Sequence, residues 1–253
     1  MDSKEYRKEL GFSNKTTLQT YFKAKDIKQP NWPKIALCND RLREIFTKLN
    51  NVVSDDIKLK NIEEFCKKID FAFSIMKENG IIEKLNNQGR EPDDVYYNWM
   101  RGYLVCEYFM PAIAKILGIK EKSIRHIGND DLTNIKTFAR SATADLEILV
   151  SAVKKIRLEI QAGYTGVNDI KQSKILEAKR IYDLEKTESY IVHFDLFNGL
   201  AAIINITNFY RIPESSYHKA FENTNVLTIK NEWFKWKLKE NLNTFKDLEI
   251  KSV

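Results

Sequence analysis

The chain of 253 residues is poor in the side chains that bind soft metals or form disulfides. It has 3 cysteines and 3 histidines, widely spaced, with no CxxC pair and no HxH or HExxH spacing. Zinc sites and disulfide frameworks depend on such spacings. The sequence therefore gives no support to a zinc knuckle, a disulfide scaffold or a metal held by histidine.

Motifs of several common enzyme classes are also missing. The sequence has no GxxxxGK[ST] loop, no GxGxxG after a strand, and no GxSxG elbow near His218. These motifs mark nucleoside triphosphatases, dinucleotide enzymes and serine hydrolases. We therefore expect no nucleotide cofactor and no hydrolase triad.

No uninterrupted apolar run reaches the length that a membrane span requires. The first ten residues are charged and lack the apolar core of a signal peptide. We therefore expect a cytoplasmic protein with reduced cysteines and no membrane partner.

Aromatic residues and basic charge are plentiful instead. The chain has 14 Phe, 11 Tyr and 4 Trp, which predicts a packed interior. The net charge is +6 and the pI is about 9.0. This balance fits a polyanionic partner, and it also fits many proteins that bind nothing anionic.

The hydrophobic period changes near the middle of the chain. Up to about residue 125 the spacing is helical, as in 61–78 and in 93–117, where Pro111 predicts a kink or break. From about residue 140 the period is two, which is typical of strands. Further along, the pattern predicts helices at 168–188 and 233–245 and strands at 189–196, 200–207 and 225–230.

These patterns predict an α/β (α+β) fold, with a mixed central sheet flanked by helices and a largely helical N-terminal half. We divide the chain into a helical region, residues 1–130, and an α/β core, residues 131–253. The helical region would pack on the core and serve DNA contacts or dimerisation. Its segment 6–18 looks superficially like a helix-turn-helix, but irregular apolar spacing after Gly11 favours a helical cap.

Two adjacent strand patterns carry acids on the face opposite their apolar residues. The first spans 144–150 and includes Asp145; the second spans 156–163 and includes Glu159 and Gln161. Paired carboxylates on a sheet form a hard-oxygen site that suits Mg²⁺. The pair therefore points to metal-assisted phosphodiester hydrolysis.

Such a site constrains the pairing of the two strands. In an antiparallel pair, directly opposite residues project to the same face. Asp145 can oppose Glu159 only in a register centred on residue 152, which predicts an odd-membered loop or a β-bulge between Val150 and Ile156. The alternative is an ordinary solvated sheet face, in which Glu147 and Arg157 pair with neighbouring side chains.

The acid followed by acid-x-Gln resembles the PD-(D/E)xK nucleases, and among them the type II restriction endonucleases. Asp145 matches the first acid of that motif, Glu159 the second, and Gln161 the position that usually holds lysine. A subgroup that cuts GATC-centred sites also carries glutamine there. The resemblance covers about residues 140–207 as a pattern.

The resemblance implies a homodimeric enzyme that cuts double-stranded DNA at a short specific sequence. Asp145 and Glu159 would bind Mg²⁺, for which Mn²⁺ can substitute, and Gln161 would position the attacking water. Relatives often add an acid from a preceding helix, and Glu107 is the candidate because it lies in an apolar helical stripe. The alternative for Glu107 is an ion pair with Arg101 or Lys115, or a position at the edge of the apolar stripe.

The segment after Gln161 is the candidate for DNA contact. It contains glycines and leads into a predicted helix whose free amides favour phosphate. The alternative is a capped, solvated helix. The candidate DNA-binding residues are Tyr164, Asn168, Lys171, Gln172, Ser173 and Lys174.

Three other functions remain open on the sequence, one of them a purely structural or protein-interaction role. A repair or recombination nuclease could use the same core on structured DNA. A non-catalytic DNA-binding regulator could read DNA through the N-terminal segment, with the acids serving only as surface.

Overall fold

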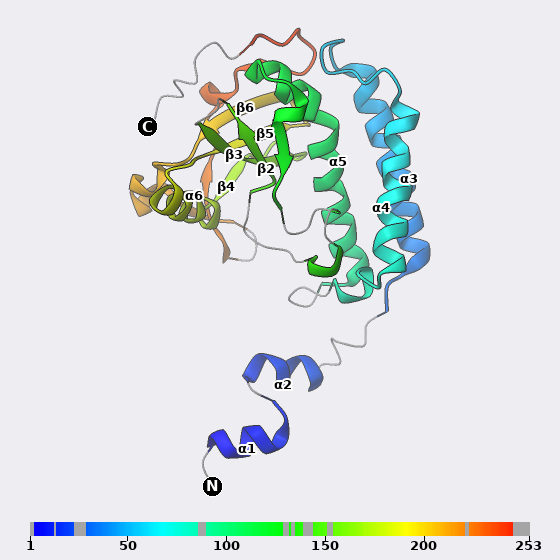
Figure 1. Cartoon of the computed structure of the whole chain (residues 1–253), viewed down its shortest axis with the longest axis vertical. Helices are drawn as coiled ribbons and strands as arrows, with labels where there is room; N and C mark the ends of the chain where they lie inside the picture. Colours follow the sequence, from blue (N-terminus) through cyan, green and yellow to red (C-terminus); the bar gives the residue numbers. More distant parts are fainter. Residues whose placement is uncertain are drawn as a thin grey trace.

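The computed structural model describes most of the chain. Described are residues 3–12, 14–22, 29–85, 90–128, 132, 135–138, 144–150, 154–220 and 223–244. Figure 1 traces them from the N-terminal helices to the C-terminal strand.

The N-terminal half is helical, as the sequence predicts. Asn61 caps the second long helix, its side chain accepting from the backbone of Glu64, and Gly118 ends the third in the left-handed conformation with φ 65°. Pro111 does not break that third helix, because its neighbours are buried in the core and packing outweighs one missing hydrogen bond. The helices are α1 (Ser3–Leu10), α2 (Lys15–Phe22), α3 (Trp32–Val52), α4 (Ile62–Glu78), α5 (Pro92–Leu117) and α6 (Gln172–Glu185).

Two sheets make up the C-terminal half. The larger has six strands in the order β1-β2-β3-β5-β6-β9, and the smaller has the order β4-β8-β7. Only β3 and β5 run parallel; the other pairs are antiparallel. The strands are β1 (Ile124–His126), β2 (Leu146–Leu149), β3 (Lys155–Gly163), β4 (Asp169–Lys171), β5 (Glu188–Asp195), β6 (Leu200–Asn205), β7 (His218–Lys219), β8 (Asn225–Thr228) and β9 (Trp236–Lys237).

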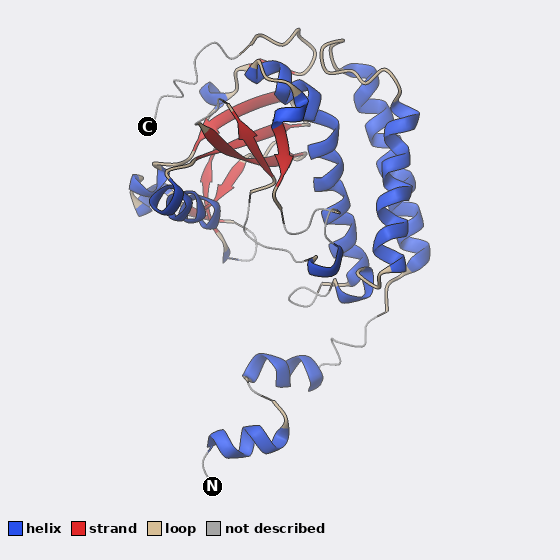
Figure 2. Cartoon of the chain, in the orientation of Figure 1, coloured by secondary structure: helices blue, strands red, loops and turns tan. Residues whose placement is uncertain are grey.

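The large sheet lies between helices. Helix α6 connects β3 to its parallel neighbour β5, and in Figures 1 and 2 α5 and α6 lie on opposite sides of the strands. The fold is therefore a mixed α/β sheet flanked by helices, which confirms the predicted class.

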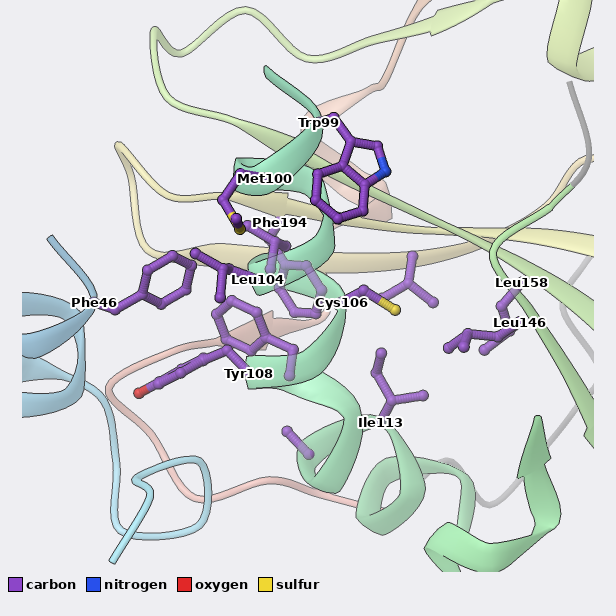
Figure 3. Packing of buried hydrophobic residues seen from close by; sticks show 14 of the residues in the cluster. Phe46, Trp99, Met100, Leu104, Cys106, Tyr108, Ile113, Leu146, Leu158 and Phe194 are labelled. Atoms are coloured by element: carbon purple, nitrogen blue, oxygen red, sulfur yellow. The ribbon is translucent and has the colours of Figure 1, made fainter. Parts of the chain in front are cut away.

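The main hydrophobic core joins the long helices to one face of the sheet. Figure 3 shows the side chains of α5 between Phe46 of α3 and the strand residues Leu146 and Leu158. The rings of Phe109 on α5 and Phe194 on β5 stack with centroids 3.9 Å apart. This core ties residues on both sides of position 130 into one cluster.

The opposite face of the sheet has a smaller core. Ile191 and Ala202 of the sheet pack there with Ile175 and Ala178 of α6. Because alternate residues of β3 and β5 enter the two cores, Glu159 and Gln161 belong to the face that α6 covers.

Two predicted helices differ from the structure. The first begins at Gln172 instead of residue 168, because the preceding residues form β4, where Ile170 is buried against β8. The second, predicted at 233–245, is wrong over its described residues. Trp236 pairs with Ala201 at the edge of the sheet, and this pairing outweighs the helical spacing.

The N-terminal segment forms two short helices, α1 and α2, which lie apart from the remaining helices in Figure 1. No residue of α1 is buried. The boundary predicted at residue 130 falls outside the described residues, and β1 before it pairs with β2 after it. Over the described residues, no helix is long and apolar enough to cross a membrane.

Candidate functional site

The hairpin of β2 and β3 has the register that the acid pair requires. Leu146 pairs with Leu158 and Leu149 with Lys155, so the register is centred on residue 152. The backbone N–H of Val150 donates to the carbonyl of Lys154 at 2.9 Å, closing a loop whose three residues, 151–153, lie outside the described part. The predicted odd-membered loop is confirmed.

Asp145 immediately precedes β2, and its carboxylate contacts the backbone of β3. Its carbonyl accepts from the N–H of Ile127 at 3.0 Å, which extends the pairing of β1 by one residue. Its Oδ2 accepts from the N–H of Ile160 at 2.6 Å. The register continued by one residue beyond Leu146 and Leu158 brings Asp145 level with Glu159, although Asp145 itself precedes the paired residues and its carboxylate bonds the backbone of β3.

Glu159 is bound by a lysine from helix α6. Nζ of Lys174 lies 2.7 Å from Oε1 of Glu159, and the two side chains are only 21% and 14% exposed. Lys174 is in the first turn of α6 because β4 carries the chain back over this face of the sheet. The sequence placed Lys174 among the DNA contacts and gave no sign that it would reach the acid pair.

Gln161 lies beside a buried polar network that the sequence analysis missed. It pairs in register with His193 on the parallel strand β5, so the two side chains share a face. Nε2 of His193 lies 2.8 Å from Oδ1 of Asn168, and the Asn168 amide donates to Asp195 at 2.7 Å. Burial lowers the pKa of His193 to about 4, despite the opposing charges of Asp195 and Asp169. The imidazole is therefore neutral at pH 7.

Glu107 lies on α5 and has two side-chain partners, the ammonium of Lys68 and the imidazole of His126. Nζ of Lys68 lies 2.7 Å and Nε2 of His126 lies 2.9 Å from its carboxylate, which is 13% exposed. Burial opposes ionisation, but the hydrogen bonds from His126 and Lys68 outweigh it and hold the pKa of Glu107 below its usual value. An ion pair therefore exists at this position, although with other partners than Arg101 or Lys115.

The pKa of the buried Cys106 thiol depends on the charges of Glu107 and of the acid pair. Burial raises the pKa of Cys106 well above its usual value, and negative charge on Asp145, Glu107 and Glu159 acts in the same direction. All three carboxylates thus lie within electrostatic reach of one buried thiol on α5.

Glu147 and Arg157 pair with neighbouring side chains, as the alternative interpretation predicts, but on a covered and not a solvated face. Glu147 is buried and forms ion pairs with Arg125 and with Lys155, the latter at 3.3 Å. Arg157 binds Glu185 at the end of α6 at 3.0 Å. These contacts are structural, and they fix the hairpin and α6 relative to each other.

The predicted DNA contacts fall into two groups. Tyr164, Lys171 and Ser173 are exposed and lie at the end of β3 or the start of α6. Asn168 and Gln172 have protein partners, the network described above and the Asn225 amide at 2.8 Å. Gly163 makes the turn after β3 possible, since a Cβ there would lie 2.9 Å from Oδ1 of Asn168.

The donor set at this site fits a hard divalent cation. The Asp145 carboxylate bonds the backbone of Ile160, the residue that follows Glu159 on β3, and Mg²⁺ is commonly held by one or two carboxylates with the remaining positions left to water and phosphate. Over the described part of the chain, no cluster of three or more His, Cys, Asp or Glu residues could hold a metal. The site thus suits Mg²⁺ shared with a phosphate better than a cage built entirely from protein.

Comparison with known proteins gives little further information. No protein-family model matches the sequence, and no curated protein matches it. Among solved structures, the chain is similar to Hjc, a Holliday junction resolvase from the archaeal hyperthermophile Archaeoglobus fulgidus, with a TM-score of 0.31 and 7% identity. The match covers 53% of this chain and 93% of that chain, and at this TM-score it carries no argument about function.

Proposed function

We propose that this protein is a Mg²⁺-dependent endonuclease that hydrolyses phosphodiester bonds of double-stranded DNA at specific sequences, as type II restriction enzymes do. The observation that supports the proposal is the register of β2 and β3, which continued by one residue brings Asp145 level with Glu159, together with the hydrogen bond from the N–H of Ile160 to the Asp145 carboxylate. Two carboxylates so placed suit a divalent cation and a phosphate.

In this proposal, Asp145 and Glu159 hold the metal ion, with Mn²⁺ able to replace Mg²⁺. When bound, such an ion lowers the pKa of water and neutralises charge that develops on the phosphate. Gln161, two residues after Glu159 on the same face, hydrogen-bonds the attacking water. Glu107 assists from α5.

Lys174 adds the positive charge that Gln161 lacks. Its ammonium lies 2.7 Å from Glu159, so it is placed to stabilise an anionic phosphate beside that acid. This role differs from the general phosphate contact that its position in the chain predicts.

DNA would lie along the end of β3 and the start of α6, where Tyr164, Lys171 and Ser173 are exposed. The free amides at the start of α6 favour a phosphate there. We further propose a cytoplasmic homodimer, since two copies of one site cut both strands of a symmetric sequence.

Incubation with duplex phage DNA and Mg²⁺ tests the proposal. The wild-type protein should give discrete fragments, and Asp145→Asn or Glu159→Gln should abolish cleavage while duplex binding in a gel-shift assay is retained. Asn at position 145 keeps an oxygen that can accept from Ile160, so the hairpin is preserved. Glu214→Gln, at an exposed position, is the matched control.

Other results would decide against the proposal. Full cleavage by Asp145→Asn would refute the assignment of the site. A protein that shifts DNA but never nicks it with Mg²⁺ or Mn²⁺ would be a non-catalytic regulator. Cleavage restricted to branched DNA would indicate a repair or recombination nuclease.

A further inference from the structure

A groove opens beside the end of β3, on the side of the sheet that faces α3 and α5. Its volume is about 510 Å³, which is within the range of small-ligand sites. Leu42, Phe46 and Val105 form its buried floor. None of these residues belongs to the acid pair.

The rim of the groove combines cations with an exposed aromatic ring. Tyr164 is 55% exposed, and the guanidinium of Arg101 lies 4.6 Å from the centre of its ring. This cation–π contact holds the tyrosine ring in place while much of the side chain stays open to solvent. A flat, oriented ring is a platform on which a nucleobase can stack.

The charges at the rim favour an anion. Arg41, Lys48 and Arg101 line the groove, and Glu44 is the single acid among the lining residues. Glu44 binds Lys48 at 2.5 Å, and Arg41 has no ion-pair partner among the described residues. Arg41 and Arg101 are therefore placed to bind a phosphate.

The groove lies at the end of β3, on the opposite face of the sheet from Glu159 and Gln161. Gln161 precedes Gly163 by two residues of β3, about 7 Å along the strand, and Tyr164 follows directly. A DNA strand therefore has to pass around this end of the sheet to contact both the acid pair and the groove.

We propose that the groove binds an unpaired nucleotide of the DNA, with its base stacked on Tyr164 and its phosphate beside Arg41 and Arg101. That the bound nucleotide belongs to DNA rests on the proposed nuclease function. The nucleotide is either extruded from a duplex or already unpaired in a branched or gapped substrate.

Fluorescence anisotropy in EDTA tests this inference, because no cleavage occurs without a divalent metal. The probes are a labelled single strand, the same sequence as a blunt duplex, and a duplex with a short unpaired stretch. Tyr164→Ala should weaken binding of the single strand and of the gapped duplex about tenfold, the effect of losing one base–aromatic stack. Binding of the blunt duplex should weaken by less than this, because Tyr164 is only one of several proposed contacts to paired DNA.

Two variants outside the groove serve as controls. Phe71→Ala removes an aromatic ring from α4 that is 60% exposed, and Lys60→Ala removes an exposed cation before the same helix. Neither should affect binding of any probe, whereas Arg41→Ala should weaken single-strand binding. The midpoint of thermal unfolding of Tyr164→Ala should equal that of the wild type, because the ring is largely exposed.

Equal affinities of Tyr164→Ala and Phe71→Ala for every probe would overturn the inference. So would an equal loss for the blunt duplex, since Tyr164 would then contact paired DNA only. These measurements involve no cleavage, so their failure is distinct from failure of the nuclease proposal, which depends on Asp145→Asn.

Discussion

The ammonium of Lys174 lies 2.7 Å from the carboxylate of Glu159, across the gap between helix α6 and strand β3. The sequence predicts Lys174 as a DNA contact and Glu159 as a metal ligand, and this ion pair brings the two together. A cation at this distance both stabilises negative charge on a phosphate and competes with a metal for Glu159.

Replacing Lys174 should therefore have two opposite effects. We expect Lys174→Met to reduce the rate of DNA cleavage on the order of a hundredfold, the typical loss when one electrostatic donor is removed. The same change should tighten Mn²⁺ binding, because a competing cation has been removed from Glu159. Cleavage kinetics and Mn²⁺ titration measure the two effects.

Lys171→Met is the matched control, since Lys171 is an exposed lysine three residues earlier. It should weaken DNA binding slightly and leave Mn²⁺ affinity unchanged. If both variants behaved alike, Lys174 would be a simple phosphate contact, as its place in the sequence suggests.

Gly163 should not tolerate a side chain. A Cβ at this position would lie 2.9 Å from Oδ1 of Asn168, 3.1 Å from the carbonyl of Val167 and 3.3 Å from Nε2 of His193. We expect Gly163→Ala to lower the free energy of unfolding by about 1–3 kcal/mol, the usual cost of overpacking. Urea unfolding measures the change.

Gly102 provides the contrasting substitution. It lies on an exposed face of α5, and a Cβ there would meet nothing within 4 Å. Gly102→Ala should stabilise the protein by about 0.5–1 kcal/mol, because alanine is the better helix former. A loss of stability at Gly102 equal to that at Gly163 would contradict the assignment of a steric conflict.

The buried imidazole of His193 should make stability depend on pH. Its pKa is lowered from 6.5 to about 4 in the folded protein, so between these values the unfolded chain binds more protons. The contribution of His193 to the free energy of unfolding is fully present above pH 6.5. As the pH falls from 6.5 toward 4, the free energy of unfolding decreases by about 3 kcal/mol in total. Urea unfolding between pH 5 and 7 measures this slope.

His193→Gln should reduce the slope, because glutamine can still donate to Asn168 but does not titrate. His218→Gln is the control, since the His218 side chain is 52% exposed. A slope unchanged by His193→Gln would show that the imidazole does not take up its proton on unfolding.

The effects of two substitutions on the rate of cleavage can distinguish a role of Glu107 in activity from its role in the ion pair with Lys68. If Glu107 assists from α5, Glu107→Gln should slow cleavage about tenfold or more. Lys68→Met breaks the same ion pair from the other side and should leave the rate of cleavage unchanged. Equal rates in the two variants would limit Glu107 to a structural role; thermal unfolding of both serves as the check on folding.

Local pattern was sufficient for most of the helices and strands. Helix α4, strands β5 and β6 and the alternation in β3 were predictable because helix caps and hydrophobic period act over a few neighbouring residues. The strand around Trp236 was not predictable, because its secondary structure depends on pairing with Ala201, a residue far away in the sequence. A lone edge strand carries little local information.

The same division applies to the candidate site. The sequence by itself determined which acids are present and which register of the two strands would bring them together, since the period of a strand is fixed. Only the tertiary structure decided that Lys174 reaches Glu159, that Lys68 and His126 bind Glu107, and that His193 is buried beside Gln161. These contacts form between elements that are distant in sequence, so they depend on how the helices pack on the sheet and not on the order of residues along any one element.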